Sequence, residues 1–252
     1  MNNPCTSFYL ILSPDIFFFI SCMYQDRKIN KLYEQIEAIK TYDSSDSLTV
    51  QVTNQKTFKD ILNLAKKYKI LTIDAEWVQP GGSVDIALLQ ISFPNGQCFL
   101  INRHQKLPNE FLAMLKNSDI LKIGIGILDE DIRRFKSQWK IQPKGLVDIR
   151  HLVVKFYPDL KKLGMKSLAL NILDVTLDKH WHVQASNWEV EKLNQRQIKY
   201  AANDVLTVMA ILLKIVAEKR CSCVQDFQDL SRIAYDLCSQ YTDVPYKDKA
   251  PK

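Results

Sequence analysis

A strand with two acids near its end is predicted for the stretch Ile70-Leu71-Thr72-Ile73-Asp74-Ala75-Glu76-Trp77. Its apolar and β-branched residues are typical of a buried strand. Asp74 and Glu76 are two residues apart, so both carboxylates leave the same face of that strand. Buried together, they repel each other unless a cation compensates them, and oxygen ligands of this kind suit Mg²⁺ or Mn²⁺. Two acids that face water at a strand end would give the same pattern.

The segments around this strand predict an α/β fold with a mixed five-stranded sheet flanked by helices. Residues 86–93 and 98–101 are expected to form strands joined by a turn at Pro94-Asn95-Gly96, which predicts an antiparallel meander with the first strand. Further strands over 120–127 and 146–148 alternate with helices, which indicates parallel crossovers. The sheet is therefore expected to be antiparallel at one edge and parallel in the remainder. Helices are predicted after Thr53 or Asn54, beyond Leu107, over 131–139, and over most of 150–236.

Composition places the chain among globular proteins with one core. It has 252 residues, 46% of them hydrophobic, which suffices for one α/β domain with a segment left at each end. The 34 Lys and Arg residues exceed the 28 Asp and Glu residues, and the net charge of +6 suits a polyanionic partner without singling one out. The six cysteines lack the spacing of a zinc site, so free thiols are predicted.

The two ends of the chain are predicted to lie outside this domain. Residues 8–23 are apolar, but Pro14 and Asp15 interrupt the run, so two interpretations stay open: a weak or interfacial membrane anchor, and a leader without a membrane role. An amphipathic helix is expected over 25–40 and a polar linker over 41–46. The predicted division is residues 1–47 for the leader, helix and linker, 48–220 for the catalytic domain, and 221–252 for a C-terminal helix and polar tail.

A further acid lies in Ile198-Lys199-Tyr200-Ala201-Ala202-Asn203-Asp204-Val205, which has helical period. Tyr200 and Asp204 are four residues apart and share one helix face. A phenol beside a carboxylate can orient a water that a metal ion on the carboxylate activates. Taken alone, such a pair is more often a core tyrosine beside a solvated aspartate.

A third acidic group, Asp129-Glu130-Asp131, follows the predicted strand Lys122-Ile123-Gly124-Ile125-Gly126-Ile127 and opens a helix. Negative charge is favourable at a helix N-terminus, so capping is one interpretation. One of the three acids is still expected near Asp74 and Glu76, at the end of the neighbouring strand.

Together these motifs resemble the DEDDy-type 3′–5′ exonuclease domains of the ribonuclease H-like superfamily, named for four acids and a tyrosine. The resemblance runs from about Thr49 to Lys219. It implies a ribonuclease H-like fold and hydrolysis of DNA or RNA from the 3′ end, releasing nucleoside 5′-monophosphates. The stretches that carry it follow one another in the family's order: 73–77, 88–92, 122–126 with the acids after it, and 197–204, with further landmarks at 146–150, 166–169 and 186–189.

The resemblance also implies roles for the acids. Asp74, Glu76 and Asp204 would hold one divalent cation, Mg²⁺ or Mn²⁺, and Asp74 would reach a second cation with support from Asp131. Tyr200 would orient the attacking water. The family pattern places the third acid at Glu130, one residue earlier. Asp131 is preferred because Phe135 follows it by four, as a bulky apolar residue follows the family's Asp, and Glu130 remains the alternative.

Substrate contacts are expected from basic residues near these motifs, because phosphate contacts dominate nucleic-acid binding. The candidates are Arg133, Arg134, Lys192, Arg196 and Lys199, the last three on one predicted helix face. The expected partner is single-stranded or 3′-ended DNA or RNA. Each side chain is equally typical of a solvated surface residue.

Two other functions compete with the exonuclease prediction. The offset third acid also fits a nucleic-acid-binding module that keeps the fold and is weakly active or inactive. Glycoside hydrolysis by paired carboxylates would leave Tyr200 and the basic excess without a role. The tail over 242–246 resembles a subgroup of the family with an N-terminal anchor at the mitochondrial surface. That subgroup implies the mitochondrial outer membrane with the domain facing the cytosol, with nucleus or cytoplasm as alternatives.

Overall fold

The computed structural model describes residues 49–51, 55–78, 85–128, 130–220 and 227–246. The predicted leader, the helix over 25–40, the linker and the glycine-containing turn at 80–82 lie outside the described residues.

The described part of the chain contains a mixed sheet in the order β1-β4-β3-β2-β5-β6. The central strand β2 (Ile70–Glu76) pairs antiparallel with β3 (Leu88–Ser92) and parallel with β5 (Leu121–Gly124). β4 (Cys98–Asn102) runs antiparallel to β3, and β6 (Leu146–Asp148) runs parallel to β5. The predicted mixed α/β sheet is confirmed, and all five predicted strands are present.

The sheet also contains a strand that was not predicted. β1 (Thr49–Gln51) pairs parallel with β4 on the outer side of the meander. The sequence predicted that the antiparallel strands form one edge of the sheet. In the structure they do not, because β1 lies outside them. Three residues give no alternation from which a strand can be predicted. The strand predicted over 120–127 is also shorter and ends at Gly124.

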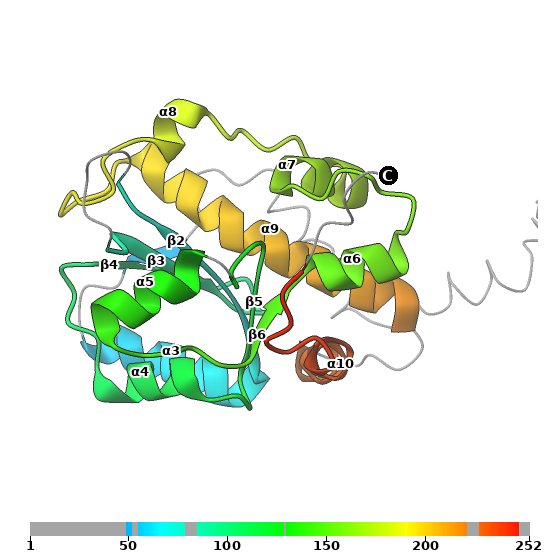
Figure 1. Cartoon of the computed structure of the whole chain (residues 1–252), viewed down its shortest axis with the longest axis horizontal. Coiled ribbons are helices and arrows are strands. Elements are labelled where there is room, and N and C mark those ends of the chain that lie inside the picture. The colour runs from blue at the N-terminus through cyan, green and yellow to red at the C-terminus, as the bar shows by residue number, and fades with distance from the viewer. Residues whose placement is uncertain (1–48, 52–54, 79–84, 129, 221–226, 247–252) are drawn as a thin grey trace, which may run out of the picture.

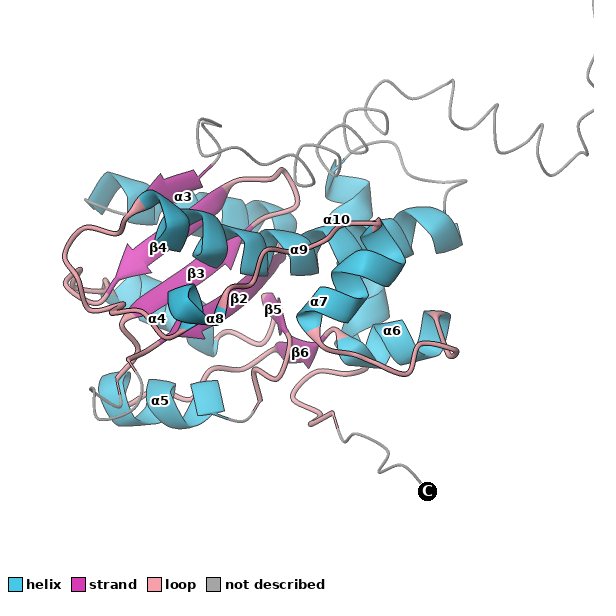
Figure 2. Cartoon of the chain, turned by 90° about the horizontal axis from the view of Figure 1, so that it is seen from above, coloured by secondary structure: helices cyan, strands magenta, loops and turns pink. Residues whose placement is uncertain are grey.

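Helices cover both faces of the sheet (Figure 1). The long helix α9 crosses one face, and α3 and α4 cover the other, while α10 packs against α9 and α3. Figure 2 shows the same arrangement from above. The bounds are α3 (Gln55–Tyr68), α4 (Asn109–Lys116), α5 (Glu130–Trp139), α6 (Arg150–Phe156), α7 (Met165–Leu168), the π-helix η1 (Ala169–Leu173), α8 (Trp181–Gln184), α9 (Gln195–Arg220) and α10 (Phe227–Ser239).

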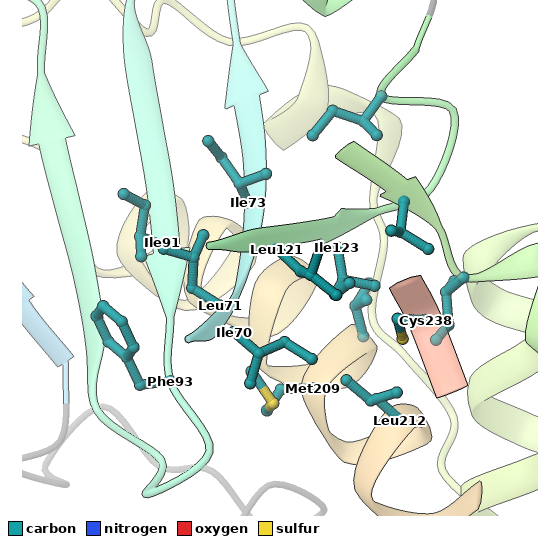
Figure 3. Close-up of a cluster of buried hydrophobic side chains, with 14 of the residues drawn as sticks. Ile70, Leu71, Ile73, Ile91, Phe93, Leu121, Ile123, Met209, Leu212 and Cys238 are labelled. Atoms are coloured by element: carbon teal, nitrogen blue, oxygen red, sulfur yellow. The ribbon is translucent and has the colours of Figure 1, made fainter. Parts of the chain in front are cut away.

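The alternation of each strand divides the core into two layers. Leu71 and Ile73 of β2 belong to the larger apolar cluster, which also contains Phe58 of α3 and Phe111 of α4. Figure 3 shows this cluster continuing to residues of α9 and to Cys238 of α10. The smaller cluster joins Leu88 of β3 and the alternate residues Cys98 and Leu100 of β4 to the first half of α9. The predicted C-terminal helix therefore packs into the same core as β2 and α9.

The helix α9 is a core helix although its composition would allow it to cross a bilayer. An 18-residue window within Gln195–Glu218 has a mean hydropathy of 1.6, and 89% of that window is buried in the domain. The helix begins at a capping box, in which Asn194 Oδ1 accepts from Gln197 N at 3.0 Å and Gln197 Oε1 accepts from Asn194 N at 3.0 Å. Lys192 lies before this cap, so the prediction that it shares a helix face with Arg196 and Lys199 is wrong.

The C-terminal tail docks onto the parallel edge of the sheet. The Asp243 carboxylate accepts hydrogen bonds from Gly145 N at 3.3 Å and Leu146 N at 3.0 Å. His151 stacks on Tyr241 at 5.0 Å between ring centroids and meets Tyr246 edge-on at 5.2 Å. These contacts hold residues after α10 against β6 and the start of α6.

Replacing Asp243 by Gly is expected to lower the free energy of unfolding by about 1–3 kcal/mol, because two backbone donors lose their acceptor. Glycine suits the left-handed backbone of this residue, whose φ is +56°, so the loss reports on the carboxylate. Urea unfolding of Asp243→Gly and Asp243→Asn measures it. Asn keeps one acceptor and should lose less; equal stability of all three proteins would contradict the role of the carboxylate.

Candidate active site

The two acids of β2 lie at the C-terminal end of the central strand, on the face that α9 covers. Asp74 pairs across the sheet with Gln90, and Glu76 pairs with Leu88. Asp74 Oδ1 accepts a hydrogen bond from Ala75 N at 2.9 Å. Both carboxylates therefore point to one side of the sheet, as the sequence predicted, while Ala75 faces the other.

Asp204 and Tyr200 come to the same place because α9 is fixed to β2 and β3. The Val205 carbonyl accepts from Thr72 Oγ1 at 3.0 Å and from Ser92 Oγ at 3.2 Å. This contact brings the helix position next to Asp204 onto the strand that carries Asp74. Asp204 is 2% exposed and Tyr200 is 5% exposed. Tyr200 and Asp204 share one face of α9, as predicted, and this face directs both side chains toward the acids of β2.

The third acid in the cluster is Asp131 and not Glu130. Asp131 is 8% exposed, and its buried Oδ1 accepts no hydrogen bond from the described residues. Glu130 projects into solvent, where Arg133 forms an ion pair with it at 2.5 Å. The structure therefore places Asp131 beside Asp74, and its catalytic role stays a prediction.

The loop before Asp131 is held by the end of β6. Gly126, in the left-handed region at φ +70°, donates from its backbone N to Asp148 Oδ2 at 2.8 Å. The buried Asp148 is paired in turn with Arg150 at 2.7 Å, and the Arg150 guanidinium lies 4.6 Å from the Tyr246 ring centroid. The docked tail therefore supports the residues that lead into α5.

Burial and mutual repulsion shift the pKa values of the acids upward. Burial is the largest cause for each of them. It raises the pKa of Asp74 and raises the pKa of Glu76 well above its usual range, with the charges of Asp74 and Asp204 adding to the second shift. The pKa of Asp131 rises to about 8 and that of Asp204 to about 7. The cluster thus holds more negative charge than its surroundings can solvate.

Lys179 is the functional candidate that sequence reasoning missed. It lies in the loop between η1 and α8, and its Nζ is 2.8 Å from Asp204 Oδ1 and 5.2 Å from the Tyr200 ring centroid. Its charge lowers the pKa values of Asp74, Glu76 and Asp204. No periodic pattern marks a lysine in a loop, so only its position in space identifies it.

A cavity of about 360 Å³ opens over these groups. Its walls include Trp77 and Trp181, and the Arg134 guanidinium lies 4.0 Å from the Trp77 ring centroid. Trp181 is 67% exposed, which is unusual for a side chain of this size. The volume falls within the range of about 300–1,000 Å³ that is typical of small-molecule sites.

The carboxylate oxygens at this site are the type of ligand that a hard divalent cation prefers. The described lining of the cavity contains the carboxylates of Asp74, Glu76 and Asp204 and no Cys or His, and Asp131 lies close enough to act on the charge of Glu76. The buried Oδ1 of Asp131 has no protein donor in the described chain. No three acidic, Cys or His side chains of the described residues converge closely enough to enclose one ion. The Lys179 ammonium supplies one positive charge to four acids, so more than one further charge is needed for neutrality.

The predicted basic residues take different positions. Arg133 is bound to Glu130, and Arg134 stacks on Trp77 at the cavity wall. Lys192 is exposed and lies before α9. Arg196 and Lys199 line a second cavity that shares Tyr200 with the first.

The family model for the 3′–5′ exonuclease matches residues 49–219. The chain belongs to the 3′–5′ exonuclease family. It is 32% identical over 166 residues to exonuclease 3′–5′ domain-containing protein 2 of Drosophila melanogaster, covering 65% of this chain and 28% of that protein. It is 31% identical over 195 residues to the Homo sapiens protein of the same name, covering 72% of this chain and 31% of that protein. The predicted subgroup within the family is thereby confirmed.

The fold of the 3′–5′ exonuclease domain is that of a solved bacterial relative. Escherichia coli RNase D, an exoribonuclease, superposes with a TM-score of 0.58 over 68% of this chain and 44% of that chain at 23% identity. This likeness shows the fold alone. Because the chain spans about three tenths of the length of the two named relatives, the activity of the whole protein is a matter for proposal.

Proposed function

We propose that this protein hydrolyses phosphodiester bonds from the 3′ end of DNA or RNA with two divalent cations, releasing nucleoside 5′-monophosphates. The observation that carries the proposal is that acids of β2 and α9 line one cavity together with Tyr200, while Asp131 of α5 lies close enough for its charge to raise the pKa of Glu76. These segments lie far apart in the sequence, and their acids have no structural reason to lie side by side, since each makes the charge of the others unfavourable.

The acids would hold the cations, Asp74, Glu76 and Asp204 on one side and Asp74 with Asp131 on the other. When bound, such ions lower the pKa of an attacking water and stabilise charge on the scissile phosphate and on the leaving 3′ oxygen. Burial and the neighbouring acids raise the pKa of Tyr200 far above its usual value, so its phenol stays protonated at neutral pH. Its hydroxyl can then orient the attacking water without losing its own proton.

Lys179 would contact the phosphate from its position beside Asp204. Its ammonium already faces Asp204 and the Tyr200 ring. A cation at this place can bind a non-bridging phosphate oxygen and stabilise the charge that develops there. The aromatic walls Trp77 and Trp181 offer flat apolar surfaces to the terminal base.

A nuclease assay tests the proposal. Single-stranded DNA and RNA of one sequence, labelled at the 5′ end, are incubated with the purified protein in Mg²⁺, Mn²⁺ or EDTA. We expect ladders of shortened products and free 5′-monophosphates with either metal ion, and none in EDTA. Equal trimming of a substrate with a blocked 3′ end would contradict the direction of hydrolysis.

The second candidate function is an inactive module that binds nucleic acid. It is favoured by one observation, that no three acids of the described chain converge on a single ion position while Lys179 is paired with Asp204. The same assay separates the two. Binding of either polymer without trimming in both metal ions would establish the binding module.

Separate substitutions of the two neighbouring acids of α5 are expected to have unequal effects on the trimming rate. Asp131→Asn should lower the trimming rate about 10- to 100-fold, because the side chain supports the metal site from within the cluster. Glu130→Gln removes only an exposed ion pair and should change the rate less than about twofold. Initial rates on one oligonucleotide compare them. A larger loss from Glu130→Gln would reassign the third acid.

Attachment to the mitochondrial outer membrane stays a proposal from family resemblance, since residues 8–23 lie outside the described chain. Carbonate extraction of cell membranes tests it. The full chain is expected to remain in the pellet, and a chain that starts at Gln25 is expected in the supernatant. Release of both would remove the anchor from the proposal.

A further inference from the structure

A second cavity of about 370 Å³ adjoins the catalytic one. We call it the flanking pocket; its lining includes His180, His182, Arg196, Lys199, Tyr200 and Asn203. Tyr200 lines both cavities, so its ring forms part of the wall between them. A ligand that extends past Tyr200 from the acids would enter the flanking pocket next.

The segment 178–184 separates the two cavities with alternate side chains. Lys179, Trp181 and Gln184 line the catalytic cavity, while His180 and His182 line the flanking pocket. One short segment therefore contacts both spaces, next to the N-terminal part of α9, where Figure 1 also shows α8. Its position suits a chain-like ligand that passes over it better than two unrelated small molecules.

The flanking pocket is lined by more Lys and Arg residues than acids. Arg196 and Lys199 are exposed, and no carboxylate of the described residues lies within ion-pair distance of either. The acid in the lining, Asp178, is paired with His180 at 3.0 Å. The first turn of α9 contains Arg196 and no acidic residue, although the helix dipole favours acids there. A ligand anion would offset this unfavourable arrangement.

We propose that the flanking pocket binds the second nucleotide from the 3′ end, with Arg196 and Lys199 contacting the phosphate on its 5′ side. The inference rests on the proposed exonuclease function, which places the bond to be cleaved at the acids. The pocket is large enough for one nucleoside, and its cations lie beyond Tyr200, where the next phosphate of the chain would follow. A dinucleotide with a 5′-phosphate is thus the smallest substrate that fills both cavities.

Two dinucleotides that differ only in the 5′-phosphate test the proposal. In the unaltered protein with Mn²⁺, the 5′-phosphate should raise kcat/KM about tenfold through a lower KM, the effect of one charge-assisted contact. In Arg196→Gln/Lys199→Gln this ratio should fall below about twofold. For a longer single strand, the slope of log K against log salt should become less steep by about 0.7 in Arg196→Gln/Lys199→Gln, because one phosphate loses its contacts.

The matched control is Lys161→Gln/Lys162→Gln, which removes the same charge from exposed residues outside both cavities. It should retain the tenfold ratio. A ratio near one in the unaltered protein, or a ratio unchanged in Arg196→Gln/Lys199→Gln, would overturn the proposal.

Calorimetric titration of the two dinucleotides in EDTA separates this proposal from the proposed function. If no protein hydrolyses any substrate but the 5′-phosphate still strengthens binding about tenfold through Arg196 and Lys199, the flanking pocket stands and the exonuclease function fails. If neither hydrolysis nor this difference in binding is found, both fail.

Discussion

Replacing Asp74 by Asn is expected to lower the rate of 3′-end trimming at least about a thousandfold, since a carboxylate that would contact both cations is lost. Asn keeps the shape and can accept the hydrogen bond from Ala75 N, so the strand should stay in place. The substitution removes only the charge. Single-turnover trimming of a 5′-labelled oligonucleotide in Mn²⁺ measures the effect.

The control for this substitution is Asp60→Asn, an exposed acid on α3 at a distance from the acids of β2. Its trimming rate should lie within about twofold of the unaltered protein. Thermal unfolding should show that Asp74→Asn is at least as stable as the unaltered protein, because one member of a repelling cluster becomes neutral. A folded Asp74→Asn protein that trims within tenfold of the normal rate would remove the acids from the mechanism.

In EDTA, the free energy of unfolding is expected to fall by several kcal/mol as the pH rises from 5.5 to 7.5. The pKa values of Asp131 and Asp204 rise to about 8 and about 7 in the folded protein, from 3.8 for an exposed Asp. A group with a raised pKa binds its proton more tightly in the folded state. Its contribution is fully present below the unfolded pKa and is lost as the pH passes through the folded value.

Divalent cations are expected to reverse this trend, because they bind the ionised acids of the folded protein only. Urea unfolding at several pH values, in EDTA and in Mn²⁺, measures both slopes. Lys122 acts in the opposite direction above pH 7, since burial lowers its pKa to about 7. The test is therefore the difference between the unaltered protein and Asp131→Asn, whose stability in EDTA should depend less on pH. If the free energy of unfolding in EDTA depends equally on pH in the two proteins, the repulsion between the clustered acids is contradicted.

The local elements of the site follow from the sequence because they depend on short-range periodicity. The alternation in β2 sends Asp74 and Glu76 to one face, and the spacing in α9 aligns Tyr200 with Asp204. The hairpin from β3 to β4 follows from its Pro-Asn-Gly turn between two apolar runs. These features, and the order of the motifs that identified the family, required no knowledge of the tertiary structure.

Elements without such periodicity could not be predicted. β1 is too short to alternate, and it exists because β4 offers an unpaired edge. The sequence predicted too early a start for α9. The capping box of Asn194 and Gln197 marks the end of the preceding loop and the beginning of the helix. In each case a pairing partner or a cap, and not the pattern of apolar residues, set the boundary.

The sequence by itself determined the family, the mixed sheet and the acids of β2 and α9, since each depends on residues within one element or on motif order. Only the tertiary structure showed that Asp131 is buried beside the other acids while Glu130 faces solvent, because neighbouring positions of α5 point in different directions. It also brought Lys179 to Asp204 and set Arg196 and Lys199 beside the catalytic cavity. Contacts between segments distant in the chain depend on how helices cross the sheet, and no local pattern encodes that crossing.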